Sequence, residues 1–132
     1  LQPGEIVSAI HLPPRGAQGG DAYLRFIPRT EMDIAVVGCA ISLTLNGDKI
    51  ATARVALGAV APKVLLVADA AAALIGTTLD DKALAALQAA ATAAAQPITD
   101  RRGTVEFRKD VTAVLAARTA RIAYARAKGA VK

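Results

Sequence analysis

Hydrophobic and polar positions alternate with a period of two between Val37 and Leu45. The odd positions are apolar, whereas the even positions carry only Gly, Ala, Ser and Thr. This period is typical of a β-strand with one buried face. Asn46-Gly47 follows directly, and this pair tolerates the positive φ angles of a tight hairpin turn. The pattern therefore predicts a β-hairpin. From Ile50 onward, its second strand should carry Ala51, Ala53, Val55 and Leu57 on one face and Thr52 and Arg54 on the other.

The residues before the hairpin combine a short apolar alternation with a long polar stretch. Residues 6–12 alternate and are followed by Pro13-Pro14, which predicts a strand that stops at the prolines. Residues 15–21 are rich in glycine and predict a flexible loop. A polar loop should then lead into the hairpin. The strand face comprises Ile6, Ser8, Ile10 and Leu12, and the polar stretch comprises Arg25, Arg29, Thr30, Glu31 and Asp33.

Beyond the hairpin, the residue pattern changes from strand to helix. A short helix over residues 67–75 should end at Gly76, a common C-terminal cap. Thr78 should cap a second helix that ends at Pro97. Negative charge in the first turn favours this start. That charge comes from Asp80 and Asp81, and the narrow apolar stripe of the helix is Leu84, Leu87 and Ala91.

A third helix is predicted from Thr104 to about Ala127. It should pack against the second helix, because the connection between them is short. A β-rich first half followed by a helical second half predicts an α+β fold, with an antiparallel sheet that carries helices on one side. The expected core face of the third helix is Phe107, Val111, Val114, Leu115 and Ile122.

Length and composition limit the class of protein. The chain has 132 residues, enough for one domain with one core. It begins with Leu1, so we expect a processed chain or a fragment, and no signal peptide is visible at its start. We expect no membrane span, because the apolar stretches are interrupted by charged residues and glycine. The single cysteine rules out an internal disulfide and is consistent with the cytoplasm.

The chemically reactive residue types are few. His11 is the only histidine and should lie at the surface, and Cys39 falls on the apolar face of a strand, where it should act as a small hydrophobe. A zinc site or a Ser–His–Asp triad needs positioned partners that this inventory does not supply. The glycines of residues 15–21 lack the spacing of a phosphate-binding loop. We therefore predict no catalytic residue and no metal ligand in this chain.

Positive charge gathers at the C-terminal end. Nine basic residues lie between Arg101 and Lys132, opposed only by Glu106 and Asp110. A basic helix of this kind could bind nucleic acid or an acidic protein. Aromatic residues are only 3% of the chain, so no stacking platform for bases accompanies the charge. A stand-alone α+β interaction module remains the alternative hypothesis.

Four blocks of the sequence resemble a known family. They are AYLRFIPRTEMDIAVVGCAISL, ARVALGAVAP, a short helix ending in LIG, and DRRGTVEFRKDV. In this order they are similar to the C-terminal domain of the FAD-binding medium subunit of molybdenum hydroxylases, the group of carbon monoxide dehydrogenase and xanthine dehydrogenase. The resemblance extends from about Leu1 to Tyr124. It implies a three-stranded antiparallel sheet packed against three helices. Residues 1–14 would be a lead-in strand after a missing FAD-binding domain, and residues 15–132 the flavoprotein C-terminal domain.

The resemblance also implies a role in electron transfer. The domain would shield the flavin and dock the subunit, so that electrons from iron–sulfur clusters reach FAD. The implied partners are a large molybdenum subunit, a small iron–sulfur subunit and the N-terminal FAD-binding domain of the same chain. The fragment alone should be inactive and bind FAD weakly or not at all, since it has no glycine-rich pyrophosphate motif. The residues implied to face the flavin are Tyr23, Arg25, Met32, Asp33 and Ile34.

A second set of residues matches the DxRG…E(F/Y)R block of the family and is implied to be structural. We expect it to form a helix cap and an ion-pair cluster rather than a catalytic site. One departure is that residues 64–67 are apolar where family members often carry a polar or basic residue, which puts one partner contact in doubt. The block comprises Asp100, Arg102, Gly103, Glu106 and Arg108.

Overall fold

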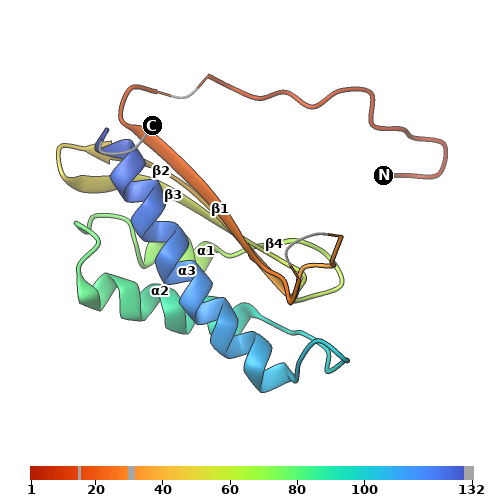
Figure 1. The fold of residues 1–132 in the computed structure, drawn as a ribbon. Coiled ribbons are helices and arrows are strands. Elements are labelled where there is room, and N and C mark those ends of the chain that lie inside the picture. The colour runs from red at the N-terminus through yellow and green to blue at the C-terminus, as the bar shows by residue number, and fades with distance from the viewer. Residues whose placement is uncertain (15, 30–31, 130–132) are drawn as a thin grey trace.

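The computed structural model describes residues 1–14, 16–29 and 32–129, and it has the predicted α+β fold. Four strands form one antiparallel sheet in the order β1-β2-β3-β4, with the last strand only two residues long. Helices lie against one face of this sheet and leave the other face open (Figure 1). The strands are β1 (Gly19–Phe26), β2 (Val37–Asn46), β3 (Lys49–Gly58) and β4 (Leu65–Leu66), and the helices are α1 (Ala68–Ala72), α2 (Asp81–Ala94) and α3 (Val105–Ala127).

The predicted hairpin is confirmed as β2 and β3, with Asn46-Gly47 at its turn. The odd positions of β2 are buried, as the alternation predicted. The prediction for Ala51 was wrong, because this residue is exposed while Ile50 is buried. The register shifts here: Thr44 pairs with Thr52, but the next residue of β2 pairs with Ile50. One extra residue in β3 thus forms a bulge, which changes the face on which the following side chains lie.

The third long strand is β1, which pairs with β2 along its whole length. The prediction of a flexible loop over residues 15–21 was wrong for its end, since β1 starts at Gly19. A Cβ atom on Gly20 would lie 2.1 Å from the carbonyl oxygen of Ala123, so α3 lies directly on the backbone of β1. Glycine is therefore required by the close approach of a helix, and it does not mark a loop here.

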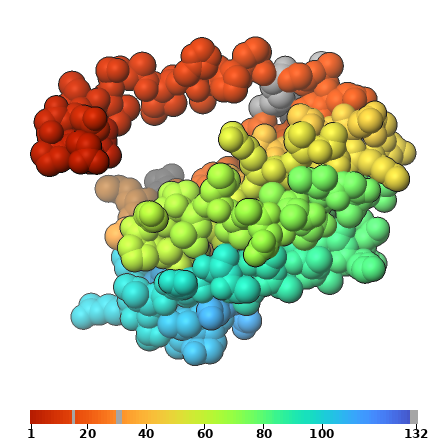
Figure 2. All heavy atoms as spheres, turned by 180° about the vertical axis from the view of Figure 1, so that it is seen from behind, coloured from red at the N-terminus to blue at the C-terminus, as the bar shows by residue number. Residues whose placement is uncertain are grey.

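Residues 1–14 form no strand, and the alternation predicted for residues 6–12 has no buried face. Ile6, Ile10 and Leu12 are all strongly exposed. The segment lies away from the rest of the molecule over most of its length (Figure 2). A strand requires a pairing partner, and this segment has none within the described part of the chain. The lead-in strand is thus absent from this structure, and Arg15 lies outside the described residues.

Helix α2 begins later than predicted. Asp80, not Thr78, is its N-cap, and the Asp80 carboxylate accepts a 2.8 Å hydrogen bond from the backbone N–H of Ala83. Leu79 has a φ of 60°, so the chain turns sharply before the helix starts. Leu84, Leu87 and Ala91 are buried as predicted. Helix α1 is also shorter than predicted and ends at Ala72, before the turn that leads to Gly76.

We expect Asp80→Ala to lower the free energy of unfolding by about 1 kcal/mol, the usual cost of losing an N-cap. In this variant, the backbone N–H of Ala83 would lose the acceptor that the Asp80 carboxylate provides. Thr78→Ala is the matched control and should change the unfolding free energy by only a few tenths of a kcal/mol, as expected of an exposed position. Urea unfolding of both variants measures the difference. Equal losses would show that the helix starts at Thr78.

The core face of α3 differs from the prediction. Leu115 is buried, but Phe107 and Val114 are exposed, and Val111 and Ile122 are only half-buried. Small and polar residues fill the interface instead, because the helix lies too close to the strands for large side chains. Phe107 packs edge-on against the Phe26 ring at 5.9 Å between centroids. Besides Leu115, the buried residues of α3 are Arg108, Thr112, Ala116, Ala117, Thr119, Ala120, Ala123 and Ala127.

Candidate functional site

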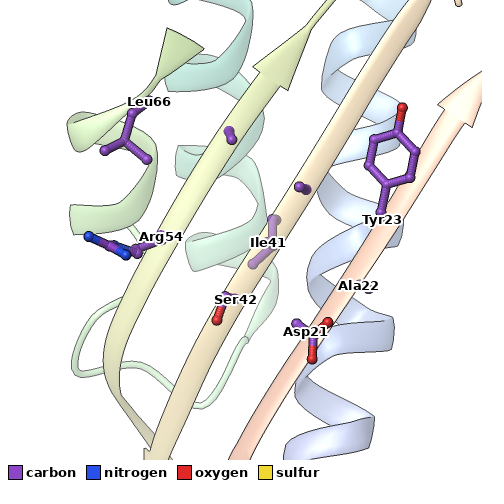
Figure 3. A pocket seen from close by; sticks show the side chains of 9 residues that line it. Asp21, Ala22, Tyr23, Ile41, Ser42, Arg54 and Leu66 are labelled. Carbon is purple, nitrogen blue, oxygen red and sulfur yellow. The ribbon is translucent and has the colours of Figure 1, made fainter. Parts of the chain in front are cut away.

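The open face of the sheet holds a shallow hollow of about 470 Å³ (Figure 3). The floor of the hollow lies along β2, which presents only small side chains there, among them Ala40 and Ser42. The Tyr23 ring, 60% exposed, leans over Gly38, where a Cβ atom would lie 3.0 Å from the tyrosine oxygen. The lining residues are Asp21, Ala22, Tyr23, Ala40, Ile41, Ser42, Arg54, Ala56 and Leu66.

The loop between β1 and β2 forms a second feature, with an anchored carboxylate and exposed apolar side chains. The N–H of Val36 donates to the carbonyl oxygen of Phe26 at 2.9 Å and closes the base of this loop. The side chain of Asp33 is only 5% exposed. It accepts hydrogen bonds from Arg29 Nε at 3.2 Å and from the N–H of Ile34 at 2.8 Å.

On either side of Asp33, two apolar residues point into solvent. Met32 is 98% exposed and has a φ of 51°, and Ile34 is 66% exposed. The turn of the backbone at Met32 is one that non-glycine residues adopt uncommonly. Together, Met32, Asp33 and Ile34 form the loop tip, in which the acidic side chain is held inward and two apolar side chains are presented outward.

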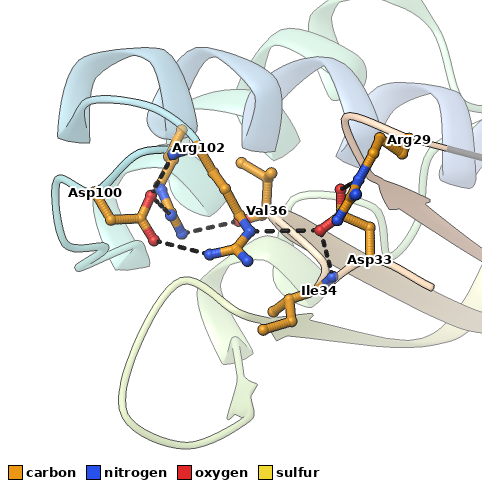
Figure 4. A network of polar contacts seen from close by, with 7 residues as sticks. Arg29, Asp33, Ile34, Val36, Asp100 and Arg102 are labelled. Atoms are coloured by element: carbon orange, nitrogen blue, oxygen red, sulfur yellow. Dashed lines mark hydrogen bonds and ion pairs between the residues drawn. The ribbon is translucent and has the colours of Figure 1, made fainter.

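A chain of charged side chains connects the loop tip to the start of α3 (Figure 4). Arg102 Nε lies 3.5 Å from Asp33 Oδ1, and Arg102 Nη1 lies 3.7 Å from Asp100 Oδ2. The backbone N–H of Arg102 also donates to Asp100 at 2.8 Å. Asp100 in turn accepts a hydrogen bond from the buried Arg108. Arg108 reaches the carbonyl oxygens of Val36 and Ala59 at 3.4 and 3.5 Å.

This arrangement confirms that the block at residues 100–108 is a helix cap and an ion-pair cluster. The Thr104 hydroxyl accepts a 3.2 Å hydrogen bond from the N–H of Phe107 and caps α3. Glu106 lies in the first turn, where backbone and Thr104 hydrogen bonds hold the pKa of its carboxyl below the usual value. At Gly103, whose φ is 155°, a Cβ atom would lie 2.6 Å from the Phe107 ring.

The arginines keep both carboxylates of the cluster ionised. For Asp33, desolvation raises the pKa, but hydrogen bonds and charge from Arg29, Arg102 and the backbone outweigh it, and the pKa is lowered. For Asp100, the hydrogen bond from Arg108 is the largest cause of a lowered pKa. The cluster is therefore fully charged at neutral pH.

Acid should weaken the domain through these carboxylates. A folded-state pKa below the unfolded value gives stability that is present above the unfolded pKa, near 4, and is lost as the pH falls through the folded value. We expect the urea midpoint of the wild type to fall between about pH 7 and about pH 3 by more than that of Asp33→Asn, since the variant has no carboxylate to protonate there. Equal pH dependence in the two proteins would contradict this expectation.

The structure separates the five residues predicted to face a flavin into two groups. Tyr23 lines the hollow, and Arg25 is exposed on the same strand, opposite Gly38 in the pairing. Met32, Asp33 and Ile34 form the loop tip, while Thr30 and Glu31 of the predicted polar stretch lie outside the described residues. The hollow's other polar side chains, Asp21, Ser42 and Arg54, were not predicted as site residues. For Ser42 and Arg54, the small and polar even positions of β2 and β3 were the available signal.

Other candidates have structural explanations. Cys39 is buried, and desolvation raises the pKa of its thiol to about 11, so it behaves as the predicted small hydrophobe. His11 is exposed, as predicted. Two basic residues at the end of the chain make structural contacts: Arg126 donates to the carbonyl oxygen of Asp21 at 2.8 Å, and Lys128 pairs with Asp48 at 2.8 Å. In the described ranges, no helix is long and apolar enough to cross a membrane.

Comparison with known proteins identifies relatives over most of the chain. A family model described as "CO dehydrogenase flavoprotein C-terminal domain" matches residues 22–123. The carbon monoxide dehydrogenase medium chain of Afipia carboxidovorans is 37% identical over 128 residues, which are 97% of this chain and 44% of that protein. The chain thus spans less than half of this relative.

Two further relatives show the same relationship. The putative xanthine dehydrogenase FAD-binding subunit of Escherichia coli K12 is 35% identical over 63 residues, 47% of this chain and 22% of that protein. A solved structure of carbon monoxide dehydrogenase from Hydrogenophaga pseudoflava, lacking the Mo-pyranopterin moiety of the molybdenum cofactor, superposes with a TM-score of 0.83 at 32% identity. The superposed region covers 87% of this chain and 40% of the chain in the solved structure.

Proposed function

Because the chain belongs to the CO dehydrogenase flavoprotein C-terminal domain family, we propose that it completes the flavin site of a molybdenum hydroxylase. In this proposal it shields the FAD and docks the medium subunit for electron transfer from iron–sulfur clusters. The observation that carries it is the loop tip, where Met32 and Ile34 are presented to solvent by a fixed carboxylate. Apolar side chains that are exposed and anchored in this way are suited to pack against a flat, mostly apolar ring.

The residues present fit one part of FAD and not the rest. Tyr23 and the loop tip offer an aromatic and an aliphatic surface for the isoalloxazine ring, and Arg25 offers a cation for its polar edge. The glycine-rich stretch at residues 15–21 lacks the spacing of a pyrophosphate-binding loop. We therefore assign the ring contact to this chain and the pyrophosphate contact to the preceding FAD-binding domain. When bound, FAD supplies the redox chemistry of the subunit, and these residues exclude water and orient the ring.

The open face of the sheet supports the docking part of the proposal. It exposes Leu66 and Tyr23 around the hollow, and no helix of the described chain covers it (Figure 3). Surfaces of this kind are commonly covered by another domain or subunit. We propose that the N-terminal FAD-binding domain, a large molybdenum subunit and a small iron–sulfur subunit surround this chain in the complete enzyme, and that the enzyme is cytoplasmic.

The visible absorption spectrum of the longest natural polypeptide that contains this chain tests the proposal. We expect bands at roughly 370 and 450 nm, as for any bound flavin whose chemistry the protein only tunes. The isolated chain is the control and should show no such bands with added FAD, because it lacks the pyrophosphate site. A natural polypeptide that is colourless and does not take up FAD would refute the proposed function.

A further inference from the structure

Among the residues that the structure describes, Arg102 is the one that connects the Asp33 carboxylate to a distant part of the domain. Arg29 also binds Asp33, but it lies in the same loop, and its side chain is 73% exposed. The ion pair between Arg29 and Asp33 therefore lies within the loop and does not connect the loop to the rest of the molecule. Among the described contacts of the Asp33 side chain, the one with Arg102 alone reaches outside the loop.

Arg102 is itself held in place. Its backbone N–H donates to Asp100, and its guanidinium group lies 3.7 Å from the same carboxylate. Asp100 is fixed by Arg108, which is buried in α3 and contacts the backbone at Val36 and Ala59. The loop tip is thus connected to the start of α3 through two carboxylates. Figure 4 shows this continuous path.

We propose that Arg102 is a positioning residue for the flavin: acting through Asp33, it sets where Met32 and Ile34 lie against the isoalloxazine ring. Hydrogen-bonded partners behind contact residues commonly determine how those residues are placed. Arginine is suited to this role, since its planar group can contact two carboxylates at once, as it does here with Asp33 and Asp100. The inference rests on the proposed function, because it requires the loop tip to face a flavin.

The test uses the complete FAD-containing subunit in its natural complex. Arg102→Leu should change the visible circular dichroism of the flavin and change its reoxidation rate by an artificial electron acceptor at least ~threefold, a small part of what misplaced groups can cost. Arg101→Leu, at the exposed neighbouring position, is the matched control and should leave both unchanged. Indistinguishable flavin signals in the two variants would overturn the inference.

A second comparison shows whether Arg102 acts through Asp33. In an Asp33→Asn background, adding Arg102→Leu should produce no further change in the flavin signals, since the charged partner is already gone. A full additional change would overturn the proposed path. If Arg102→Leu does not fold, Arg102→Lys serves instead: it keeps the charge but contacts the two carboxylates less well, and it should give a smaller change in the same signals. Flavin signals unaltered by Arg102→Lys would count against the inference.

The two proposals fail in different ways. If the wild-type complex contains no flavin, the proposed function falls and the role of Arg102 falls with it. If the flavin is present and responds only to substitutions outside the path from Arg102 to Asp33, the proposed function stands and the positioning role is wrong. Thermal unfolding of the same variants separates a loss of stability from a change at the flavin. A purely structural role of Arg102 would lower the stability and leave the flavin signals unchanged.

Discussion

Gly20→Ala should destabilise the domain by about 3 kcal/mol or more, at the upper end of what overpacking costs. The added Cβ atom would lie 2.1 Å from the carbonyl oxygen of Ala123 and 2.5 Å from the backbone nitrogen of Ala127. Both neighbours are backbone atoms of α3, so no side chain can rotate away to make room. The helix would have to move off β1, which would open the packing along much of its length. Urea unfolding of the variant measures this loss.

Gly58→Ala is the matched control for this substitution. Gly58 also lies in a strand, at the end of β3, and a Cβ atom there would have nothing within 4 Å. We expect a change of less than about 0.5 kcal/mol, as for ordinary surface substitutions. A similar loss in both variants would mean that glycine at position 20 is important for the strand itself and not for the approach of α3.

Arg108→Met should lower the free energy of unfolding by about 2–4 kcal/mol, because it removes a buried charged donor from several acceptors at once. Methionine fills much of the same space, so the loss reflects the hydrogen bonds more than a cavity. The carbonyl oxygens of Val36 and Ala59 would lose their contacts with the guanidinium group, and Asp100 would lose its strongest partner. Chemical denaturation at neutral pH checks the size of the effect.

The control for Arg108 lies on the same helix. Arg118 is exposed, and Arg118→Met should change stability by less than about 0.5 kcal/mol. If Arg108→Met were equally mild, the ion-pair cluster would contribute little to the fold. The arrangement of the loop tip would then have to depend on Arg29 and the base of the loop.

The hairpin could be predicted from sequence because its information is local. Alternation over β2 and the Asn46-Gly47 turn both lie within a few residues of the structure they specify. The bulge at Ala51 was hidden, since the small side chains of Ala51, Thr52 and Ala53 fit either face equally well. Strand β1 was missed for a different reason, since residues 15–21 and the stretch from Arg25 were both predicted to be loops. The glycines near the start of β1 suggest a turn when only neighbouring residues are considered. Gly20 is instead required because α3, which is formed by residues far along the chain, packs directly against it.

The core face of α3 was misjudged because hydrophobicity alone ranked its residues. Phe107 and Val114 are the more apolar, yet Thr112 and Thr119 are the ones fully buried. The distance between helix and sheet decided this, and no single-sequence pattern reports that distance. The same applies to the candidate site. Each residue of the ion-pair cluster could be singled out, but the link from Arg102 to Asp33 depends on the fold.

The position of α3 after the sheet in the chain has a consequence for biosynthesis. This helix covers β1 and β2, and its last turns bind the strands and the hairpin turn: Arg126 donates to the carbonyl oxygen of Asp21, and Tyr124 donates to that of Asp48. The ribosome makes the sheet before it makes α3, so the apolar face of the hairpin stays uncovered until α3 has been synthesised. Contacts this distant in sequence also form slowly. The nascent domain is therefore most vulnerable to aggregation in the interval between synthesis of the hairpin and packing of α3 on it.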